Sequence, residues 1–486
     1  MVVVGGGIAG LSAAYALSQA DPPVACTLVE ADSRLGGKIL TEQAEGFVIE
    51  GGPDSFLSQK PWGIELCRTL GLEDRLIGTN PNTRRTFVYS NGRLEELPEG
   101  LAMGMPSKVG PLLRSGLLSW PGKLRLGAEI FVPRRREDSD ESLGDFFRRR
   151  LGREALERII EPLMTGIYAG DADRLSIRAT FPRFSDMERE HGSLVCAMLA
   201  ARRRQQTPGM GGSRWTPFVT LRGGLSELVQ ALIGRLSAVT VCLGRRVTAV
   251  RSGGTGQGYE VAVEGASPMK ADAVVLATPA FGAAGLLEPL DATVAGLLGT
   301  IPYASTATVT LGFRRDGFRH DLDGYGFVVP RIEGRALLAS TWSSSKWDHR
   351  APDGSALIRA YLGGDGREAV LERSDQGLVA LARADLRHVM GVTEEPVMAR
   401  VFRWPRAMPQ YLVGHLDRLA VIEKRLARLP GVFVAGAAYR GVGIPDCIRD
   451  GLGAAEKVVD YLNERQAVIS VSAQAPPIAE RAGRLL

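Results

Sequence analysis

Three glycines near the start of the chain have the spacing of a phosphate-binding turn. A short apolar run at 2–4 leads directly into Gly5-x-Gly7-x-x-Gly10, and apolar residues at helical spacing follow. The first glycine permits a tight turn, the second lets a pyrophosphate approach the backbone, and the third allows close helix–strand packing. A second apolar run ends on Glu30, an acid placed to accept hydrogen bonds from a ribose. The pattern predicts a dinucleotide-binding βαβ unit; the alternative is a glycine-rich turn in another βαβ unit.

Three further stretches are expected to approach the same ligand. Arg34-Leu35-Gly36-Gly37-Lys38 follows soon after the acid, and Gly52-Pro53-Asp54-Ser55 offers backbone donors with small polar side chains. Near the C-terminus, Gly443-Ile444-Pro445 opens a helix whose free N–H groups would face negative charge on a cofactor. For each stretch the alternative is a plain turn or a helix cap.

Side chains for other kinds of catalysis are not recognisable in the sequence. No Ser/His/Asp triad, catalytic carboxylate pair or metal-ligand cluster can be identified, and the five histidines stand apart. We expect these histidines to be structural or exposed. The pattern favours chemistry carried by a redox cofactor, which the protein positions and tunes electrostatically.

The bulk composition describes a globular protein of several domains. A chain of 486 residues, 45% hydrophobic and 23% charged, predicts two or three domains. Five scattered cysteines without C-x-x-C spacing favour a reducing cytoplasm over a disulfide framework or a zinc site. The first strand leaves no room for a signal peptide, and no apolar run approaches the ~20 residues of a membrane span. We therefore expect a cytoplasmic protein that lies at most on a membrane surface.

The net charge of +5 is modest and includes three short arginine runs, at 134–136, 148–150 and 202–204. Each run is expected to be a solvated face. Attraction to anionic lipid or to an acidic substrate is the alternative, and no nucleic-acid partner is expected.

The order of the expected elements indicates an α/β fold whose nucleotide-binding domain is discontinuous. Buried strands near 274–277 and 432–435 return to the first βαβ unit, so the predicted domain comprises residues 1–75, 212–290 and 408–465. Four runs between 239 and 277 predict a small sheet inside it.

The remaining segments predict two inserted domains and a tail. Residues 76–100 and 291–407 carry mainly strand patterns, including a hairpin at Asn91-Gly92, and predict an antiparallel substrate domain. Residues 101–211 are mainly helical and basic, with Ser142 as a helix cap and Pro162 interrupting a helix. Residues 466–486 predict a flexible tail.

Several longer motifs resemble a known family. The glycine pair at 36–37 is similar to that of the flavoprotein superfamily of amine oxidases, phytoene desaturases and porphyrinogen oxidases. More narrowly, the chain resembles the soluble bacterial protoporphyrinogen/coproporphyrinogen III oxidases of the HemY type in its motifs at 52–56, 161–171, 408–415 and 441–448. The similarity covers nearly the whole chain, to about Leu462.

The resemblance implies a fold of the amine oxidase/p-hydroxybenzoate hydroxylase type. It would combine an FAD-binding Rossmann-like domain, an antiparallel-sheet substrate domain and a helical domain that is membrane-associated in some members. The implied activity is the six-electron oxidation of coproporphyrinogen III, protoporphyrinogen IX or both to the porphyrin, with non-covalent FAD, molecular oxygen as acceptor and release of hydrogen peroxide. Peripheral membrane contact and transient contact with ferrochelatase are further expectations.

The family's functional residues carry over by motif. Because the flavin carries the chemistry, no catalytic side chain and no metal are assigned. The expected wall of the substrate slot is Gly166, Tyr168 and Gly170, a pattern that leaves a flat backbone surface for a tetrapyrrole. The expected FAD-binding residues are Gly5, Gly6, Gly7, Ile8, Ala9, Gly10, Glu30, Ala31, Arg34, Gly37, Lys38, Gly52, Pro53, Asp54, Ser55, Val247, Trp404, Gly443, Ile444 and Pro445.

The propionates of a porphyrinogen require cationic groups at the rim of an apolar slot. Arg174 and Arg178 are candidates, although surface roles are the stronger alternative. Plant and animal relatives carry a carboxylate-binding arginine near the strand before Asn91, where this chain has Ser90, so that anchor is absent or displaced. The bacterial chain type favours coproporphyrinogen III, with four propionates, over protoporphyrinogen IX, with two.

Three alternatives to a porphyrinogen oxidase are a flavin amine oxidase, a phytoene-type desaturase and a non-enzymatic FAD-binding scaffold. The absence of a cysteine at 404–409 and of any lysine between Lys270 and Lys346 counts against an amine oxidase. Desaturases lack the motif at 443–447. A scaffold would need no substrate slot.

Overall fold

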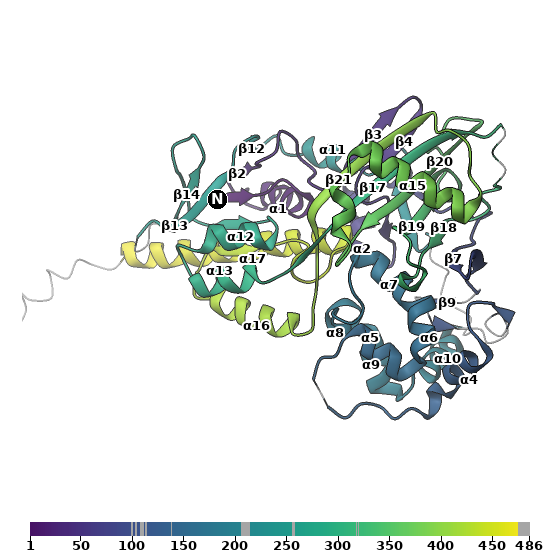
Figure 1. Ribbon diagram of the computed structural model, residues 1–486. Coiled ribbons are helices and arrows are strands. Elements are labelled where there is room, and N and C mark those ends of the chain that lie inside the picture. Colours follow the sequence, from purple (N-terminus) through teal and green to yellow (C-terminus); the bar gives the residue numbers. More distant parts are fainter. Residues whose placement is uncertain are drawn as a thin grey trace, which may run out of the picture.

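The computed structural model describes residues 1–98, 101–102, 105–106, 111, 114–137, 139–205, 214–254, 258–316, 318 and 320–474. Figure 1 shows the region around the N-terminus that is expected to bind a nucleotide (the nucleotide-binding region), a large sheet beside it, and a helical region packed below that sheet. The predicted boundary at 211–212 and the end of the predicted tail lie outside the described residues.

A five-stranded parallel sheet forms the centre of the nucleotide-binding region. Its order is β12-β2-β1-β16-β22, and each neighbouring pair is parallel. Short apolar strands buried on both faces are typical of a parallel sheet covered by helices. The strands are β1 (Val2–Val4), β2 (Cys26–Val29), β12 (Val239–Cys242), β16 (Val274–Leu276) and β22 (Val432–Val434).

Alternate residues of these strands face two hydrophobic cores. Val3 and Val275 belong to one core and Val2 and Val274 to the other. The first core packs against α1 (Ile8–Ser18), α2 (Pro61–Thr69), α11 (Ser226–Ile233) and α17 (Ile444–Gln474). The second packs against α12 (Ala280–Leu287), α13 (Ala292–Gly299), α16 (His415–Leu426) and a small sheet of β13 (Val247–Ser252), β14 (Tyr259–Val263) and β15 (Met269–Ala271).

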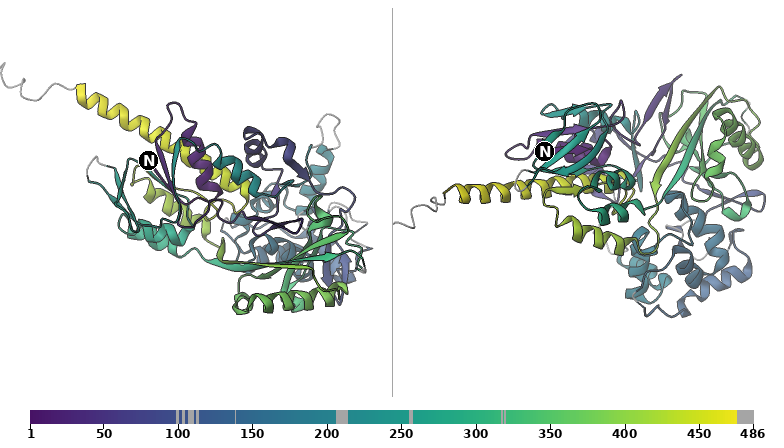
Figure 2. Two further views of the ribbon diagram at one scale, coloured as in Figure 1. Left: turned by 90° about the horizontal axis from the view of Figure 1, so that it is seen from above. Right: turned by 60° about the vertical axis from the view of Figure 1, so that its left-hand side comes forward.

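Three expectations for this region need correction. Strand β12 is not part of the small sheet, because the chain returns through α11 to the edge of β2, where Val239 pairs with Cys26. Helix α13 lies in the part expected to form the substrate domain, yet its apolar face packs in the nucleotide-binding core. Helix α17 continues to Gln474, past residue 466 where the tail was expected to begin, and extends beyond the body of the molecule (Figure 2).

The second region is a seven-stranded sheet of order β21-β17-β20-β19-β18-β7-β8, with α15 (Asp375–Met390) against its core. All pairings are antiparallel except β18 with β7, which is parallel. The predicted hairpin is present between β7 and β8, with Asn91 and Gly92 at positive φ, as its turn requires. The strands are β7 (Phe87–Ser90), β8 (Arg93–Glu96), β17 (Tyr303–Arg314), β18 (Gly326–Val328), β19 (Leu337–Trp342), β20 (Ser355–Gly363) and β21 (Met398–Pro409).

Short elements connect these two regions. They include the hairpin of β3 (Thr41–Ala44) and β4 (Phe47–Glu50) and the small sheet of β5 (Phe56–Leu57), β11 (Phe218–Leu221) and β6 (Leu76–Gly78). Single turns of helix are η1 (Glu73–Arg75), η4 (Arg331–Glu333), α14 (Ser343–Lys346) and η5 (Glu368–Glu372).

The third region is helical and has its own hydrophobic core. The predicted cap Ser142 accepts a hydrogen bond from the backbone N–H of Asp145 (2.9 Å). Pro162 does not end its helix but lies where the π-helical turn η3 changes to the α-helix α7, so the predicted interruption is a change of helical geometry rather than a break. The elements are β9 (Leu101–Ala102), β10 (Met105–Pro106), α4 (Trp120–Gly127), η2 (Ala128–Phe131), α5 (Leu143–Leu151), α6 (Arg153–Ala155), η3 (Leu156–Ile160), α7 (Glu161–Tyr168), α8 (Ile177–Thr180), α9 (Pro182–His191) and α10 (Leu194–Gln205).

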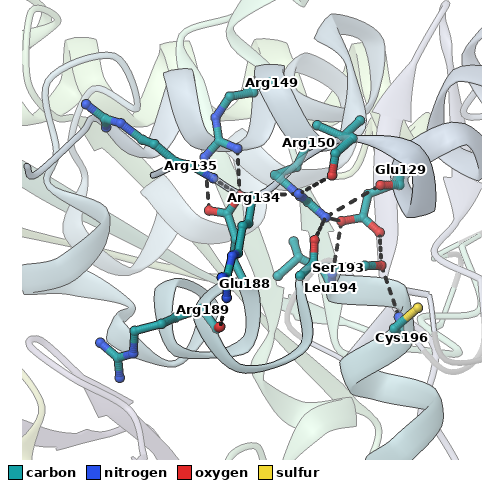
Figure 3. Close-up of polar contacts among 12 residues, drawn as sticks. Glu129, Arg134, Arg135, Arg149, Arg150, Glu188, Arg189, Ser193, Leu194 and Cys196 are labelled. Carbon is teal, nitrogen blue, oxygen red and sulfur yellow. Dashed lines mark hydrogen bonds and ion pairs between the residues drawn. The ribbon is translucent and has the colours of Figure 1, made fainter. Parts of the chain in front are cut away.

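A buried ion pair of Arg150 with Glu129 holds the helical region together (Figure 3). The Glu129 carboxylate also accepts hydrogen bonds from the backbone N–H of Leu194 (2.9 Å) and the hydroxyl of Ser193 (2.5 Å). The carboxylate therefore caps the start of α10 while its arginine partner on α5 is fully buried. The arginine run at 148–150 is thus only partly a solvated face.

Candidate functional site

The glycine turn between β1 and α1 leaves an open space in front of the helix start. Gly5 has φ +104°, and a Cβ there would lie 2.7 Å from the carbonyl oxygen of Ala277. A Cβ at Gly10 would overlap the Gly5 carbonyl, whereas one at Gly7 would meet no atom within 4 Å. Helix α1 begins at Ile8 with no side-chain cap on its N–H groups. Open space before uncapped N–H groups fits a bound phosphate.

The acid and the second glycine pair lie against this turn. The Glu30 carboxylate accepts hydrogen bonds from the backbone N–H of Gly6 (2.5 Å) and of Asp32 (2.8 Å), which places it at the end of β2 beside the glycines. Gly36 pairs with Gly7, and a Cβ at Gly37 would lie 3.0 Å from the Gly7 Cα. The two glycine segments therefore stack on each other, as expected if both approach one pyrophosphate.

The basic residues of the second glycine segment have different surroundings. The Arg34 guanidinium donates hydrogen bonds to the carbonyl oxygens of Leu35 (3.3 Å), Gly37 (2.5 Å) and Ile39 (3.2 Å), so it stabilises the turn itself. Lys38 makes no hydrogen bond or ion pair to the described part of the chain. Burial lowers the pKa of its ammonium group. A half-buried ammonium without a counter-ion among the described residues fits an anionic cofactor.

Hydrogen bonds from the large sheet hold the turn at 51–55 in place. The carbonyl oxygen of Gly51 accepts hydrogen bonds from Trp404 Nε1 (2.8 Å) and from the Arg359 guanidinium (3.1 Å), which also bonds the carbonyl of Gly52. A Cβ at Gly52 would overlap the carbonyl of Lys38, so the two segments touch.

The Asp54 carboxylate contacts buried side chains of the protein and not open space. Its carboxylate accepts hydrogen bonds from Lys346 Nζ (3.2 Å), Trp347 Nε1 (3.4 Å) and the hydroxyl of Ser55 (2.7 Å). Burial alone would raise the pKa of Asp54, but Lys346 and Arg359 hold it well below its usual range. Asp54 therefore remains ionised as part of a buried ion cluster.

The start of α17 closes the site from the C-terminal side. Pro445 lies beside Gly63, where a Cβ would be 3.2 Å from the proline ring. The next residue, Asp446, forms an ion pair with Lys60 Nζ (2.5 Å). One turn further, a Cβ at Gly451 would overlap the carbonyl of Ala9, so α17 and α1 lie in direct backbone contact.

The expected substrate wall follows α7. Gly166 borders open space, since a Cβ there would meet no atom within 4 Å, whereas Gly170 packs against the Gln410 side chain. The Tyr168 ring is buried between Phe181 (ring centroids 5.9 Å apart) and Tyr411 (5.7 Å). Burial raises the pKa of Tyr168, so its phenol stays protonated. Of the three predicted residues, only Gly166 therefore faces clear open space.

Tyr411 joins this wall to the segment before α17. Its hydroxyl donates to the carbonyl oxygen of Ala437 (2.6 Å) and accepts from the backbone N–H of Gly441 (2.9 Å). His415 stacks on the Tyr411 ring at 4.2 Å and donates from Nε2 to the carbonyl oxygen of Tyr439 (3.1 Å). Burial lowers the pKa of His415 to about 4, so this histidine is a neutral structural residue.

The remaining predicted residues lie outside the segments described so far. Val247 is buried in the core beside β1 and β2, and Ala31 is exposed after β2. Arg174 is exposed and pairs with Asp365 (2.8 Å), while Arg178 lies half-buried on α8. Ser90 is buried and accepts a hydrogen bond from Arg158 Nη1 (2.6 Å).

The structure thus brings together the segments around 5–10, 30, 36–38, 51–52, 404 and 443–445. Asp446 lies in the predicted motif at 441–448, although its ion pair was not predicted. Sequence reasoning missed the other residues that support the site from elsewhere, namely Lys60, Lys346, Arg359 and Gly451. No local motif marks their roles, because each acts through a contact distant in sequence.

Comparison with known proteins agrees with this geometry. The model of the flavin-containing amine oxidoreductase family matches residues 8–459. The chain belongs to this family. Membership confirms the predicted flavin cofactor, FAD, and the predicted class of enzyme, an oxidoreductase.

Individual relatives confirm the narrower resemblance to porphyrinogen oxidases. The chain is 39% identical to a coproporphyrinogen III oxidase of Bacillus subtilis, over 95% of this chain and 98% of that protein. It is 32% identical to a chloroplastic protoporphyrinogen oxidase of Oryza sativa, over 95% and 88% of the two chains. A solved structure from Exiguobacterium sp. 255-15, assigned as a protoporphyrinogen oxidase, superimposes with a TM-score of 0.83 at 34% identity, covering 95% of this chain and 98% of that one.

Proposed function

We propose that this protein is a porphyrinogen oxidase of haem biosynthesis that prefers coproporphyrinogen III and transfers the electrons to oxygen, with release of hydrogen peroxide. The observation that carries the proposal is the 39% identity, over nearly the full length of both chains, to a protein named coproporphyrinogen III oxidase. The lower identity of 32% to a protoporphyrinogen oxidase favours coproporphyrinogen III over protoporphyrinogen IX.

The site geometry supports binding of FAD by this chain's own residues. Its pyrophosphate would lie at the open face of Gly7, with Lys38 as the counter-ion and Glu30 on the ribose. The start of α17 at Ile444 would direct backbone N–H groups toward the cofactor, where they would stabilise negative charge on its reduced form. When bound, FAD supplies the hydride-accepting chemistry.

Three of the expected FAD-binding residues would act indirectly, by holding backbone turns in place. Arg34, Asp54 and Trp404 would position the turns at 36–38 and 51–52 rather than bind FAD alone. The open face at Gly166 would admit a flat, apolar macrocycle, and the packed rings of Tyr168, Phe181 and Tyr411 would exclude water behind it. The nucleotide-binding region, the seven-stranded sheet and the helical region would act as the FAD, substrate and helical domains.

Aerobic turnover of purified, flavin-loaded protein tests the proposal. Coproporphyrinogen III and protoporphyrinogen IX are supplied side by side, and porphyrin fluorescence and peroxide are followed. We expect both signals, with the higher kcat/KM for coproporphyrinogen III. No fluorescence gain over a flavin-free blank with either substrate would contradict the proposal and favour an amine oxidase. A higher kcat/KM for protoporphyrinogen IX would overturn the preference alone.

A membrane surface is a second proposed partner. Trp120 (68% exposed), Leu124 (73%) and Phe131 (82%) present apolar side chains on the helical region. Lys123 lies 4.8 Å over the Trp120 ring, and Arg134 and Arg136 are exposed nearby in sequence. Apolar rings beside cations are suited to the surface of an anionic bilayer.

Vesicle co-sedimentation tests this contact. Vesicles with phosphatidylserine should retain the protein and lose it at high salt, and Phe131→Ser should weaken retention. Equal sedimentation with and without vesicles would contradict the proposal. None of the described helices has the length and hydropathy to cross a bilayer. Contact with ferrochelatase stays a prediction.

A further inference from the structure

The helix that carries the expected substrate wall contains a single turn of π-helix. This turn, η3, spans Leu156–Ile160 and leads directly into α7. Isolated π-helical turns are rare and frequently mark functional sites, because they redirect side chains out of the regular helical register. Arg158 is the middle residue of the turn.

Arg158 has donors that the described protein does not use. Its one hydrogen bond to the described residues runs from Nη1 to the hydroxyl of Ser90 (2.6 Å), although a guanidinium carries five N–H groups. The nearest carboxylates, Glu154 and Glu333, are each 3.9 Å away, beyond hydrogen-bonding distance. The Arg158 side chain is 22% exposed, so it is neither buried in an ion pair nor fully solvated.

Both neighbouring carboxylates are engaged elsewhere. Glu154 accepts hydrogen bonds from the backbone N–H (2.7 Å) and hydroxyl (2.6 Å) of Ser119, at the start of α4. Glu333 accepts one from the backbone N–H of Asn91 (3.1 Å) in the hairpin turn. They lower the local positive potential, but among the described residues they leave N–H groups of the guanidinium without an acceptor.

Arg158 lies on the same helical segment as the expected substrate wall. Gly166, the wall residue that faces open space, lies eight positions after Arg158, which corresponds to about 12 Å along the helix. This span is comparable to the width of a tetrapyrrole with its propionate arms. Helix α7 packs against β18 and β19, and η3 packs against β7, so Arg158 lies where the helical region meets the large sheet.

We propose that Arg158 binds a propionate carboxylate of the substrate, positioned by its hydrogen bond to Ser90. The inference rests on the proposed function, because it assumes a porphyrinogen on the α7 wall. A planar guanidinium can bind a carboxylate through two parallel hydrogen bonds, which provides orientation as well as attraction. Arg158 thereby holds the macrocycle edge remote from Gly166 and contributes to the preference for a substrate rich in propionates.

The variant Arg158→Gln tests this role, with Arg153→Gln as the matched control. Arg153 lies one turn away, is largely exposed and pairs with Glu157 (2.6 Å). We expect Arg158→Gln to raise KM for coproporphyrinogen III about tenfold, with kcat changed less than twofold, and the control to resemble wild type. An unchanged KM in Arg158→Gln with normal flavin content would overturn the inference.

A binding measurement on the wild-type protein keeps the test independent of variant folding. Titration with coproporphyrin III and with its tetramethyl ester, followed by flavin or porphyrin fluorescence, compares charged and neutral carboxyl groups on one ring. We expect at least tenfold weaker binding of the ester, and equal affinities would overturn the inference. If wild type does not oxidise porphyrinogens at all, the proposed function fails instead, so the two failures are distinguishable.

Discussion

The guanidinium of Arg359 donates a hydrogen bond of 3.1 Å to the carbonyl oxygen of Gly51, a residue 308 positions away in the sequence. Arg359 lies on β20 of the seven-stranded sheet, and Gly51 begins the turn that touches the second glycine segment. The same carbonyl accepts the Trp404 indole hydrogen bond. The large sheet therefore directly positions a backbone turn of the nucleotide-binding region.

Replacing Arg359 should loosen this turn and destabilise the fold. Arg359→Met leaves the Gly52 carbonyl without its buried donor, removes one donor from the Gly51 carbonyl and removes a cation near Asp54, so we expect a loss of about 3 kcal/mol in the free energy of unfolding and a lower flavin content. Denaturant unfolding and the flavin absorbance of purified protein measure both effects. The control Arg400→Met removes a half-exposed pair between β21 and Glu42 on β3 and should cost under about 1 kcal/mol. Equal losses in the two variants would contradict the prediction.

Two glycines of α17 should respond oppositely to alanine. Gly451→Ala places a methyl group against the carbonyl of Ala9, so it should separate α17 from α1, lower the melting temperature and weaken FAD binding. Gly453→Ala meets no atom within 4 Å and should stabilise the helix by up to about 1 kcal/mol. Thermal unfolding of both variants, with and without added FAD, makes the comparison. Stabilisation by Gly451→Ala would show that the two helices are not packed this closely.

Lys38 should be needed for cofactor affinity rather than for folding. Burial without a counter-ion lowers the pKa of its ammonium, and a bound pyrophosphate would reverse this effect. We expect Lys38→Met to weaken FAD binding at least tenfold in a flavin fluorescence titration, while the apoprotein stays folded. Lys424→Met, at an exposed position of α16, is the control. Wild-type affinity in Lys38→Met would exclude Lys38 from the phosphate site.

Glu50 should make stability depend on pH near neutrality. Burial raises the pKa of its carboxyl from 4.5 to about 7, despite the opposing charges of Arg350 and Arg359. The folded state then holds a proton that the unfolded chain has released. The stability that Glu50 contributes is complete below pH 4.5 and is lost as the pH rises through about 7.

Glu50→Gln should therefore flatten the pH dependence of unfolding. Between pH 5 and 8 the change in the free energy of unfolding should shrink by up to about 3 kcal/mol, as measured by urea unfolding at each pH. Glu42, on the same hairpin, pairs with Arg400 near the surface. The control Glu42→Gln should therefore leave the pH dependence of the free energy of unfolding unchanged. If the free energy of unfolding depends on pH equally in Glu50→Gln and in wild type, Glu50 does not hold a proton in the folded state.

The sequence by itself determined several local elements of the fold and of the site. The glycine turn at 5–10, the acid after β2, the hairpin at Asn91-Gly92 and the cap at Ser142 all form as predicted. Their signals are short-range: backbone conformation, apolar periodicity and hydrogen bonds between residues a few positions apart. The longer motifs at 161–171 and 441–448 also sufficed to identify the family.

Only the tertiary structure decided how these elements are supported. It placed β12 in the parallel sheet, packed Gly451 on Ala9, and brought Arg359 and Lys346 behind the turn at 51–55. It also showed that Arg34 bonds its own turn and that Arg158 reaches Ser90. Such contacts depend on how separate segments pack around shared cores, and residue spacing along the chain carries no information about partners hundreds of positions apart.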